Sequence, residues 1–155
     1  MQSSIYTKSV VGLFVIAVVA ILVGCGGFDA STSIQDLNAT NAQRLANLYV
    51  SHQQHNLGRG PKNEAEFKAY IKQVNPVLLE RIGVDPNQVD ALFTSDRDGE
   101  ALEVRYGIKG FATSDPVPVV FEKTGVEGVR LVAFTRRDAE QVSDDAEYQK
   151  LLNQK

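Results

Sequence analysis

The chain holds few of the residues on which most catalytic and metal sites depend. Its 155 residues include one cysteine, two histidines, one methionine and no tryptophan. One cysteine cannot form an intramolecular disulfide, and one cysteine with two histidines cannot complete a four-ligand zinc site of these residue types. The lack of tryptophan and of internal methionine disfavours carbohydrate-binding platforms and methionine-rich grooves. No serine lies in a Gly-x-Ser-x-Gly elbow. The residues therefore predict neither a cofactor nor a catalytic centre.

The N-terminal 25 residues carry the most specific pattern in the chain. Lys8 precedes an apolar run of about 14 residues, Val10 to Val23, and the chain then reaches Gly24 and Cys25. A bilayer-spanning helix needs about 20 residues, so this run is short for a permanent span. A positive residue, a short apolar region and small residues before a cleavage point are the layout of a secretory signal peptide. Residues 22–25, Leu-Val-Gly-Cys, resemble the lipobox of bacterial lipoproteins.

The lipoprotein resemblance implies an N-terminal lipid anchor. In that family the cysteine receives a diacylglycerol, the signal peptide is cleaved before it, and the new amino group takes a further acyl chain such as palmitate. Here residues 1–24 become the signal peptide and Cys25 the first residue of the mature chain. Two buried acyl chains hold a protein stably on a membrane. Gly26 stands where inner-membrane lipoproteins often carry aspartate, which favours the outer membrane. The alternative is an uncleaved N-terminal helix with a free thiol at Cys25.

The rest of the chain is predicted to be a short tether and one domain. Residues 25–33 comprise the lipidated cysteine and a small, polar stretch whose last eight residues span about 15 Å root-mean-square. Residues 34–155 suit a single domain with its own core. With Lys8 removed, 15 basic residues face 19 acidic ones, a net charge of −4. This balance favours neither nucleic acid nor adsorption to anionic lipid.

Helical periodicity dominates the first half of the domain. Apolar residues on one face predict a first helix over 34–56, which two glycines and a proline then end. Asn63, with Glu66 three residues later, predicts the capped start of a second helix. One or two further helical turns are expected over 77–82. A last helix is expected after the acidic turn that Ser143 opens.

The second half changes to the periodicity of strands. Alternating apolar residues predict a strand over 101–108, and segments rich in valine and phenylalanine predict strands over 117–122 and 129–135. The glycine-containing link 123–128 suits a hairpin loop, and Pro118 suggests that its strand lies at an edge. We therefore expect an α+β fold with two N-terminal helices, a small three-stranded antiparallel sheet and a C-terminal helix.

Two segments of the domain resemble the heads of pseudopilins. In residues 45–66, LANLYVSHQQHNLGRGPKNEAE, an amphipathic helix ends in Asn-x-Gly, and a proline and a polar residue then open a second helix. In residues 95–107, an Asp-Arg-Asp-Gly turn precedes a strand that carries Arg-Tyr-Gly. Nearly the whole mature chain is also similar to uncharacterised secreted lipoproteins of planctomycete-type bacteria. The resemblance implies a sheet packed on the first helix and a surface location, but no reaction. The leader departs from the pseudopilin pattern because Ala17 stands where glutamate is expected after Gly12.

An acidic turn is the first candidate for a binding site. Asp96 and Asp98 precede Gly99, and calcium loops place carboxylate oxygens on such tight bends. The distal glutamate of an EF-hand is missing, since Val104 occupies its position. The alternative is a solvated turn that starts a strand.

Two basic pairs complete the candidates. His52 and His55, three residues apart on the first helix, could share a metal, or could be one half-buried and one exposed histidine without ligand function. Arg136 and Arg137 could meet an acidic partner, or could simply end a strand in solvent.

These predictions lead to two main hypotheses of function. The first is a lipid-anchored, non-enzymatic protein of the bacterial cell envelope that binds or scaffolds with its sheet and adjoining loops. Its partners would be the membrane, through the lipid, and an envelope protein, but not nucleic acid. The second is a pseudopilin-like subunit of a secretion or assembly apparatus, held by an uncleaved N-terminal helix. A hydrolase of wall or sugar substrates would need carboxylates that converge in a cleft, and the sequence does not identify them.

Overall fold

A computed structural model describes residues 38–110 and 115–154. The predicted signal peptide, the lipidation of Cys25 and the tether lie outside the described residues. The helices of the described part are α2 (Asn41–His55), α3 (Glu64–Ile71), α4 (Pro76–Arg81), the 3-10 helix η1 (Val89–Phe93) and α5 (Asp145–Asn153). The strands are β1 (Glu103–Val104), β2 (Pro118–Phe121), β3 (Arg130–Phe134) and β4 (Arg137–Val142).

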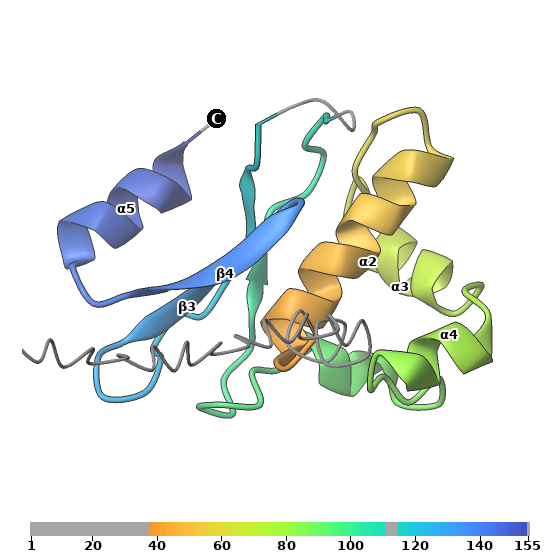
Figure 1. Cartoon of the computed structure of the whole chain (residues 1–155), viewed down its shortest axis with the longest axis horizontal. Helices are drawn as coiled ribbons and strands as arrows, with labels where there is room; N and C mark the ends of the chain where they lie inside the picture. Colours follow the sequence, from red (N-terminus) through yellow and green to blue (C-terminus); the bar gives the residue numbers. More distant parts are fainter. Residues whose placement is uncertain (1–37, 111–114, 155) are drawn as a thin grey trace, which may run out of the picture.

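The elements form a sheet with helices on both faces. The strands pair antiparallel in the order β1-β2-β3-β4, so each strand lies beside its neighbour in sequence. Helix α5 lies on one side of the sheet, and α2 lies on the other side, with α3 and α4 beyond it (Figure 1). The predicted mixture of helices, an antiparallel sheet and a C-terminal helix is confirmed. The predicted number of elements is wrong, because the described residues hold four strands, and three α-helices and η1 precede them.

Strand β4 is the element that the sequence did not reveal. Its residues RDAEQV alternate too weakly for a strand prediction, since Val142 is its only large apolar residue. The strand forms because β3 reverses through a turn at Thr135-Arg136, and pairing then runs from Phe134 opposite Arg137 to Arg130 opposite Val142. Arg136 adopts a φ of +59° in this turn. The expectation that Arg136 and Arg137 follow the last strand was therefore wrong, because Arg137 begins β4.

Two details of the other strands also differ from expectation. The alternation over 101–108 yields only a two-residue ladder, Glu103–Val104, because the following residues pair instead with the segment after α2. Pro118 does not lie on an edge strand, since β2 lies between β1 and β3. Proline is tolerated there because it is the first residue of the strand.

Side-chain caps fix the starts of the helices. Thr40 accepts the Gln43 amide, and the Gln43 side chain accepts the Thr40 amide, which makes a capping box and starts α2 seven residues later than expected. Asn63 accepts the Glu66 amide at 2.9 Å and starts α3 as predicted. Asp144 caps α5 in the same way.

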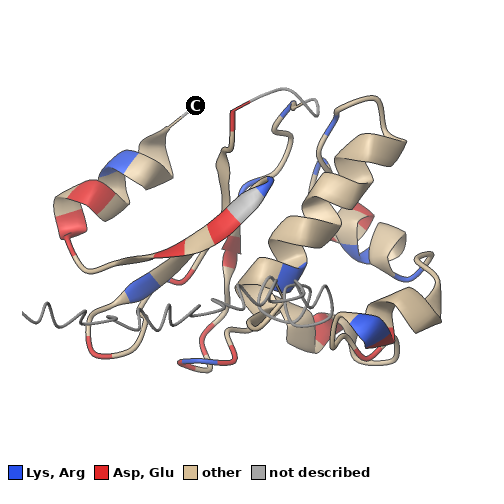
Figure 2. Cartoon of the chain, in the orientation of Figure 1, with Lys and Arg blue, Asp and Glu red and all other residues tan. Residues whose placement is uncertain are grey.

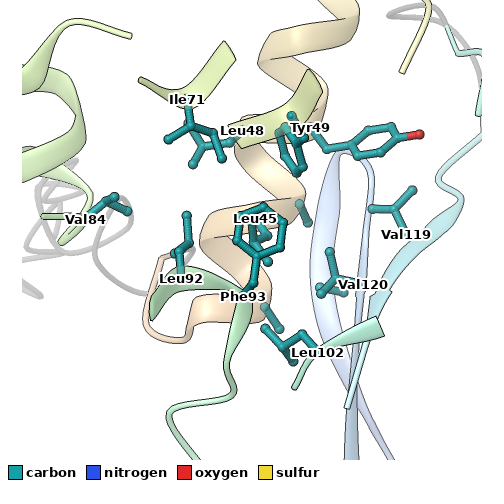
Figure 3. Packing of buried hydrophobic residues seen from close by; sticks show 14 of the residues in the cluster. Leu45, Leu48, Tyr49, Ile71, Val84, Leu92, Phe93, Leu102, Val119 and Val120 are labelled. Atoms are coloured by element: carbon teal, nitrogen blue, oxygen red, sulfur yellow. The ribbon is translucent and has the colours of Figure 1, made fainter. Parts of the chain in front are cut away.

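The core has two parts because β3 is buried on both faces. Leu131 and Ala133 face the larger cluster, which α2 dominates with Leu45, Leu48 and Tyr49 (Figure 3). The remaining β3 residues pack against Tyr148 of α5 in a second, smaller cluster. Double burial explains the nearly continuous apolar sequences of β2 and β3. Within residues 38–110 and 115–154, no helix combines the length and the apolar character needed to cross a bilayer.

Candidate functional site

Helix α2 ends in a turn that exposes a leucine. The Gly58 amide donates to the Gln53 carbonyl at 2.8 Å, and the Asn56 side-chain amide donates to the His52 carbonyl at 2.8 Å, so the last carbonyls of the helix are satisfied locally. Between these caps, Leu57 has a φ of +53°, in the left-handed region where glycine or asparagine is usual. Leu57 is 84% exposed. The turn therefore directs a large apolar side chain into solvent.

Hydrogen bonds join this turn to the segment that follows β1. The Gly60 amide donates to the Ile108 carbonyl at 2.9 Å, and the Gly110 amide donates to the Gly58 carbonyl at 2.8 Å. The hydroxyl of buried Tyr49 accepts the Ile108 amide at 3.0 Å. An added Cβ at Gly60 would lie 2.1 Å from the Tyr49 hydroxyl, so only glycine lets the chain pass this close. Burial raises the pKa of Tyr49 to about 12, and the hydroxyl stays protonated.

The two joined segments bring three cations to one hollow. Arg59 and Lys109 lie opposite each other in an isolated antiparallel bridge, and Lys62 follows three residues after Arg59. All three residues are exposed and line a hollow of about 430 Å³. Its other lining residues are His52, His55, Asn56, Leu57, Gly60, Glu66 and Gly107. No residue of the described ranges gives the side chain of Arg59, Lys62 or Lys109 a hydrogen bond or an ion pair. We name this region, Leu57 with Arg59, Lys62 and Lys109, the basic corner.

The carboxylate in this lining is engaged elsewhere. Glu66 Oε2 accepts the backbone amide of Lys62 at 2.7 Å, which holds the segment before α3 in place. Glu66 therefore orders the backbone beside the cations and forms no ion pair with them among the described residues. The corner keeps a net positive charge.

The two predicted histidines both lie at this corner, but they are used differently. His52 is buried, and its Nδ1 donates to the Arg59 carbonyl at 3.0 Å, because a carbonyl can only accept. His55 is exposed, and its Nδ1 lies 2.8 Å from the Ser51 carbonyl. Each imidazole thus has one nitrogen committed to the backbone. Over the described residues, no group of three histidine, cysteine or acidic side chains is placed to hold a metal ion.

Two further hollows adjoin the basic corner. One, of about 290 Å³, shares Leu57 and includes Gln53, Gly110 and Arg136. The Arg136 guanidinium donates to the Asp115 carbonyl at 3.4 Å. The other, of about 470 Å³, shares His55 and Asn56 and runs between α2 and α4. Three hollows thus adjoin the end of α2.

The acidic turn of the calcium prediction is tied into the fold. Asp96 accepts the Asn41 amide at 3.2 Å and lies 3.5 Å from Arg44. Asp98 accepts the amides of Glu100 at 3.0 Å and Gly125 at 2.7 Å. Burial opposes ionisation of Asp98, but these amides outweigh it and hold its pKa below the usual value. The two carboxylates reach different elements, and whether they bind calcium stays a prediction.

A buried polar network beside this turn was not foreseen. Glu122, at the end of β2, is buried, and its Oε1 accepts the Ser95 hydroxyl at 2.7 Å. Its Oε2 accepts both the Arg97 guanidinium and the Leu131 amide at 2.7 Å. Every oxygen of this carboxylate is therefore used to hold the 95–99 turn against β2 and β3. These hydrogen bonds join the loop that follows η1 to the sheet.

Helices α2 and α5 pack on the two faces of the sheet. The charges around it are unevenly distributed. Acidic residues recur along β4 and at the start of α5 (Figure 2). They are Asp138, Glu140, Asp144, Asp145 and Glu147. The loops at the end of α2 carry the three cations of the basic corner.

Comparison with family models, with curated proteins and with solved structures gives no match. The candidate site therefore stands on geometry. The sequence prediction placed the histidines but missed the four residues of the basic corner. Their only signal was the basic, glycine-rich character of Leu57–Lys62 and Ile108–Gly110, and nothing in the sequence pairs these two segments.

Proposed function

We propose that the chain is a lipid-anchored, non-enzymatic binding protein of the bacterial cell envelope, held through Cys25. The pattern of residues 22–25 supports the anchor, because a single cysteine follows a short apolar run and a glycine. The observation that carries the binding role is the basic corner, where three cations without an ion-pair partner among the described residues line a hollow beside an exposed leucine. The protein would act through this surface and not through a catalytic group.

The experiment that tests the anchor is mass spectrometry of the protein from membranes of its native host. An N-terminal peptide that begins at acylated Cys25, and that disappears in a Cys25→Ser variant, is the expected result. An unmodified thiol with residues 1–24 still attached would refute the proposal.

The second candidate is a pseudopilin-like subunit held by an uncleaved N-terminal helix. One observation favours it: α2 packs against β2 and β3, and a helix packed on a short antiparallel sheet is what the resemblance implies. The same mass spectrum separates the two candidates, since only this one retains residues 1–24.

A further inference from the structure

Leu57 contributes little to the stability of the fold. Leucine pays a steric penalty in the left-handed region, where its φ of +53° lies, and glycine or asparagine avoids that penalty. Burial does not compensate, because Leu57 is 84% exposed. A strained and exposed apolar side chain is a reason to look for a function.

The neighbouring cations are also unfavourable for the isolated domain. Arg59, Lys62 and Lys109 have like charge, line one hollow and lack ion-pair partners among the described residues. Some other cations of the described residues do form ion pairs, as Lys68 does with Glu64 and Asp90. The charges of the corner are therefore available to an anionic surface outside the chain.

We infer that the basic corner docks on a bilayer that bears anionic phospholipids. Arg59, Lys62 and Lys109 bind lipid phosphates, and Leu57 inserts among the headgroups. Cations beside an exposed apolar side chain are the combination that binds membrane interfaces. A soluble anion would engage the same cations but would leave Leu57 without a partner. The inference rests on the proposed function only in that the chain must be held at a membrane.

The length of the chain permits this orientation. Asn38, the first described residue, adjoins the start of α2, and the corner lies at the other end of that 15-residue helix, about 22 Å away. Thirteen residue steps from Cys25 to Asn38 can span at most about 43 Å. The anchor and the corner can therefore contact the same bilayer, with α2 directed toward it.

The absence of tryptophan makes a direct test practical. A Leu57→Trp variant places the only indole of the chain at the corner. A Val126→Trp variant is the matched control, because Val126 is a 40% exposed apolar residue in the loop between β2 and β3. Each protein is reconstituted, in whichever membrane-bound form mass spectrometry identifies, into vesicles of phosphatidylcholine alone or mixed with phosphatidylglycerol. A chain that is not acylated at Cys25 would refute the proposed function, but its docking on vesicles could still be measured, so the two outcomes remain separate.

The expected result is a blue-shifted emission of Leu57→Trp that lipids with brominated acyl chains quench, only when phosphatidylglycerol is present. Val126→Trp should show neither effect. Neutralising Arg59 or Lys62 with glutamine in the Leu57→Trp background should weaken docking about fivefold per cation, and raised salt should do the same. Equal quenching at both positions, or quenching that does not depend on phosphatidylglycerol, would overturn the inference. Displacement by inorganic phosphate at low concentration would also overturn it, since it would identify a soluble anion as the ligand.

A Leu57→Asn variant separates docking from folding. Asparagine tolerates the left-handed region, so the thermal midpoint of unfolding should stay the same or rise. Protection of residues 57–62 from hydrogen exchange on anionic vesicles should fall. A lower midpoint together with unchanged protection would show that Leu57 serves the fold and would refute its role in docking.

Discussion

Removal of the Glu122 carboxylate should be among the most destabilising single changes in the domain. Its side chain is 1% exposed and accepts three hydrogen bonds at 2.7 Å, from Ser95, Arg97 and the Leu131 amide. In Glu122→Ala, the buried amide and hydroxyl lose their acceptor, and Arg97, only 22% exposed, loses its counter-ion. Breaking a buried pair from one side costs about 3–5 kcal/mol.

The isosteric change Glu122→Gln should lower the free energy of unfolding by less than Glu122→Ala does. One amide oxygen can still accept from Arg97 and Leu131. The hydrogen bond from the Ser95 hydroxyl is lost, because the Ser95 oxygen already accepts the amides of Arg97 and Asp98 and cannot accept from the new amino group. Charge-assisted hydrogen bonds are about twice as strong as neutral ones, so the expected loss is about 1–2 kcal/mol. Glu100→Gln is the control, because Glu100 is exposed and its substitution should change stability by less than about 0.5 kcal/mol.

The assay is urea unfolding of the membrane-extracted protein, followed by far-ultraviolet circular dichroism. The order expected for the free energy of unfolding is wild type and Glu100→Gln, then Glu122→Gln, then Glu122→Ala. A loss below about 1 kcal/mol in Glu122→Ala would refute the argument, because it would mean that water or a rearranged side chain replaces all three hydrogen bonds.

Two further predictions concern Tyr49, which supports the basic corner from within. Gly60→Ala should lower the free energy of unfolding in urea by about 1–3 kcal/mol, because the new Cβ would lie 2.5 Å from the Tyr49 ring. Gly128→Ala is the control: its Cβ would meet nothing within 4 Å, so only its φ of +79° should lower the free energy of unfolding. Equal decreases in the two variants would count against the steric argument. The folded pKa of about 12 lies above the unfolded value of 10.0, so the contribution of Tyr49 to stability should be complete below pH 10 and should fall by up to about 3 kcal/mol between pH 10 and 12. Tyr49→Phe should flatten this loss without abolishing it, since burial also raises the pKa of Tyr106 to about 12; an unchanged pH profile would contradict the assignment.

Local signals in the sequence predicted most of the elements. The Asn63 cap and the apolar spacing of α2 depend on residues three or four apart, and both predictions are confirmed. Strand β4 was missed because its stability comes from pairing with β3 and from Val142 packing beside Tyr148, which are tertiary interactions. Propensity and periodicity carry no information about such partners.

The candidate site was harder to predict for the same reason. Arg59 and Lys109 are 50 positions apart and meet only because Gly60 passes closely over Tyr49 and pairs with Ile108. The histidines were noticed because they share one helix. The cations were not noticed, because each alone resembles an ordinary solvated charge.

The net charge of the chain does not indicate the docking surface that we infer. The predicted mature chain carries −4, which by itself argues against anionic lipid. Exposed charges are screened beyond about 8–10 Å at physiological ionic strength, so a surface responds to the charges near it and not to the total. Helix α5, which begins with Asp145 and Glu147, lies across the sheet from α2, whereas Arg59, Lys62 and Lys109 line one hollow at the end of α2. Such a charge distribution would also orient the domain, because an anionic bilayer would attract the basic corner and repel the acidic end.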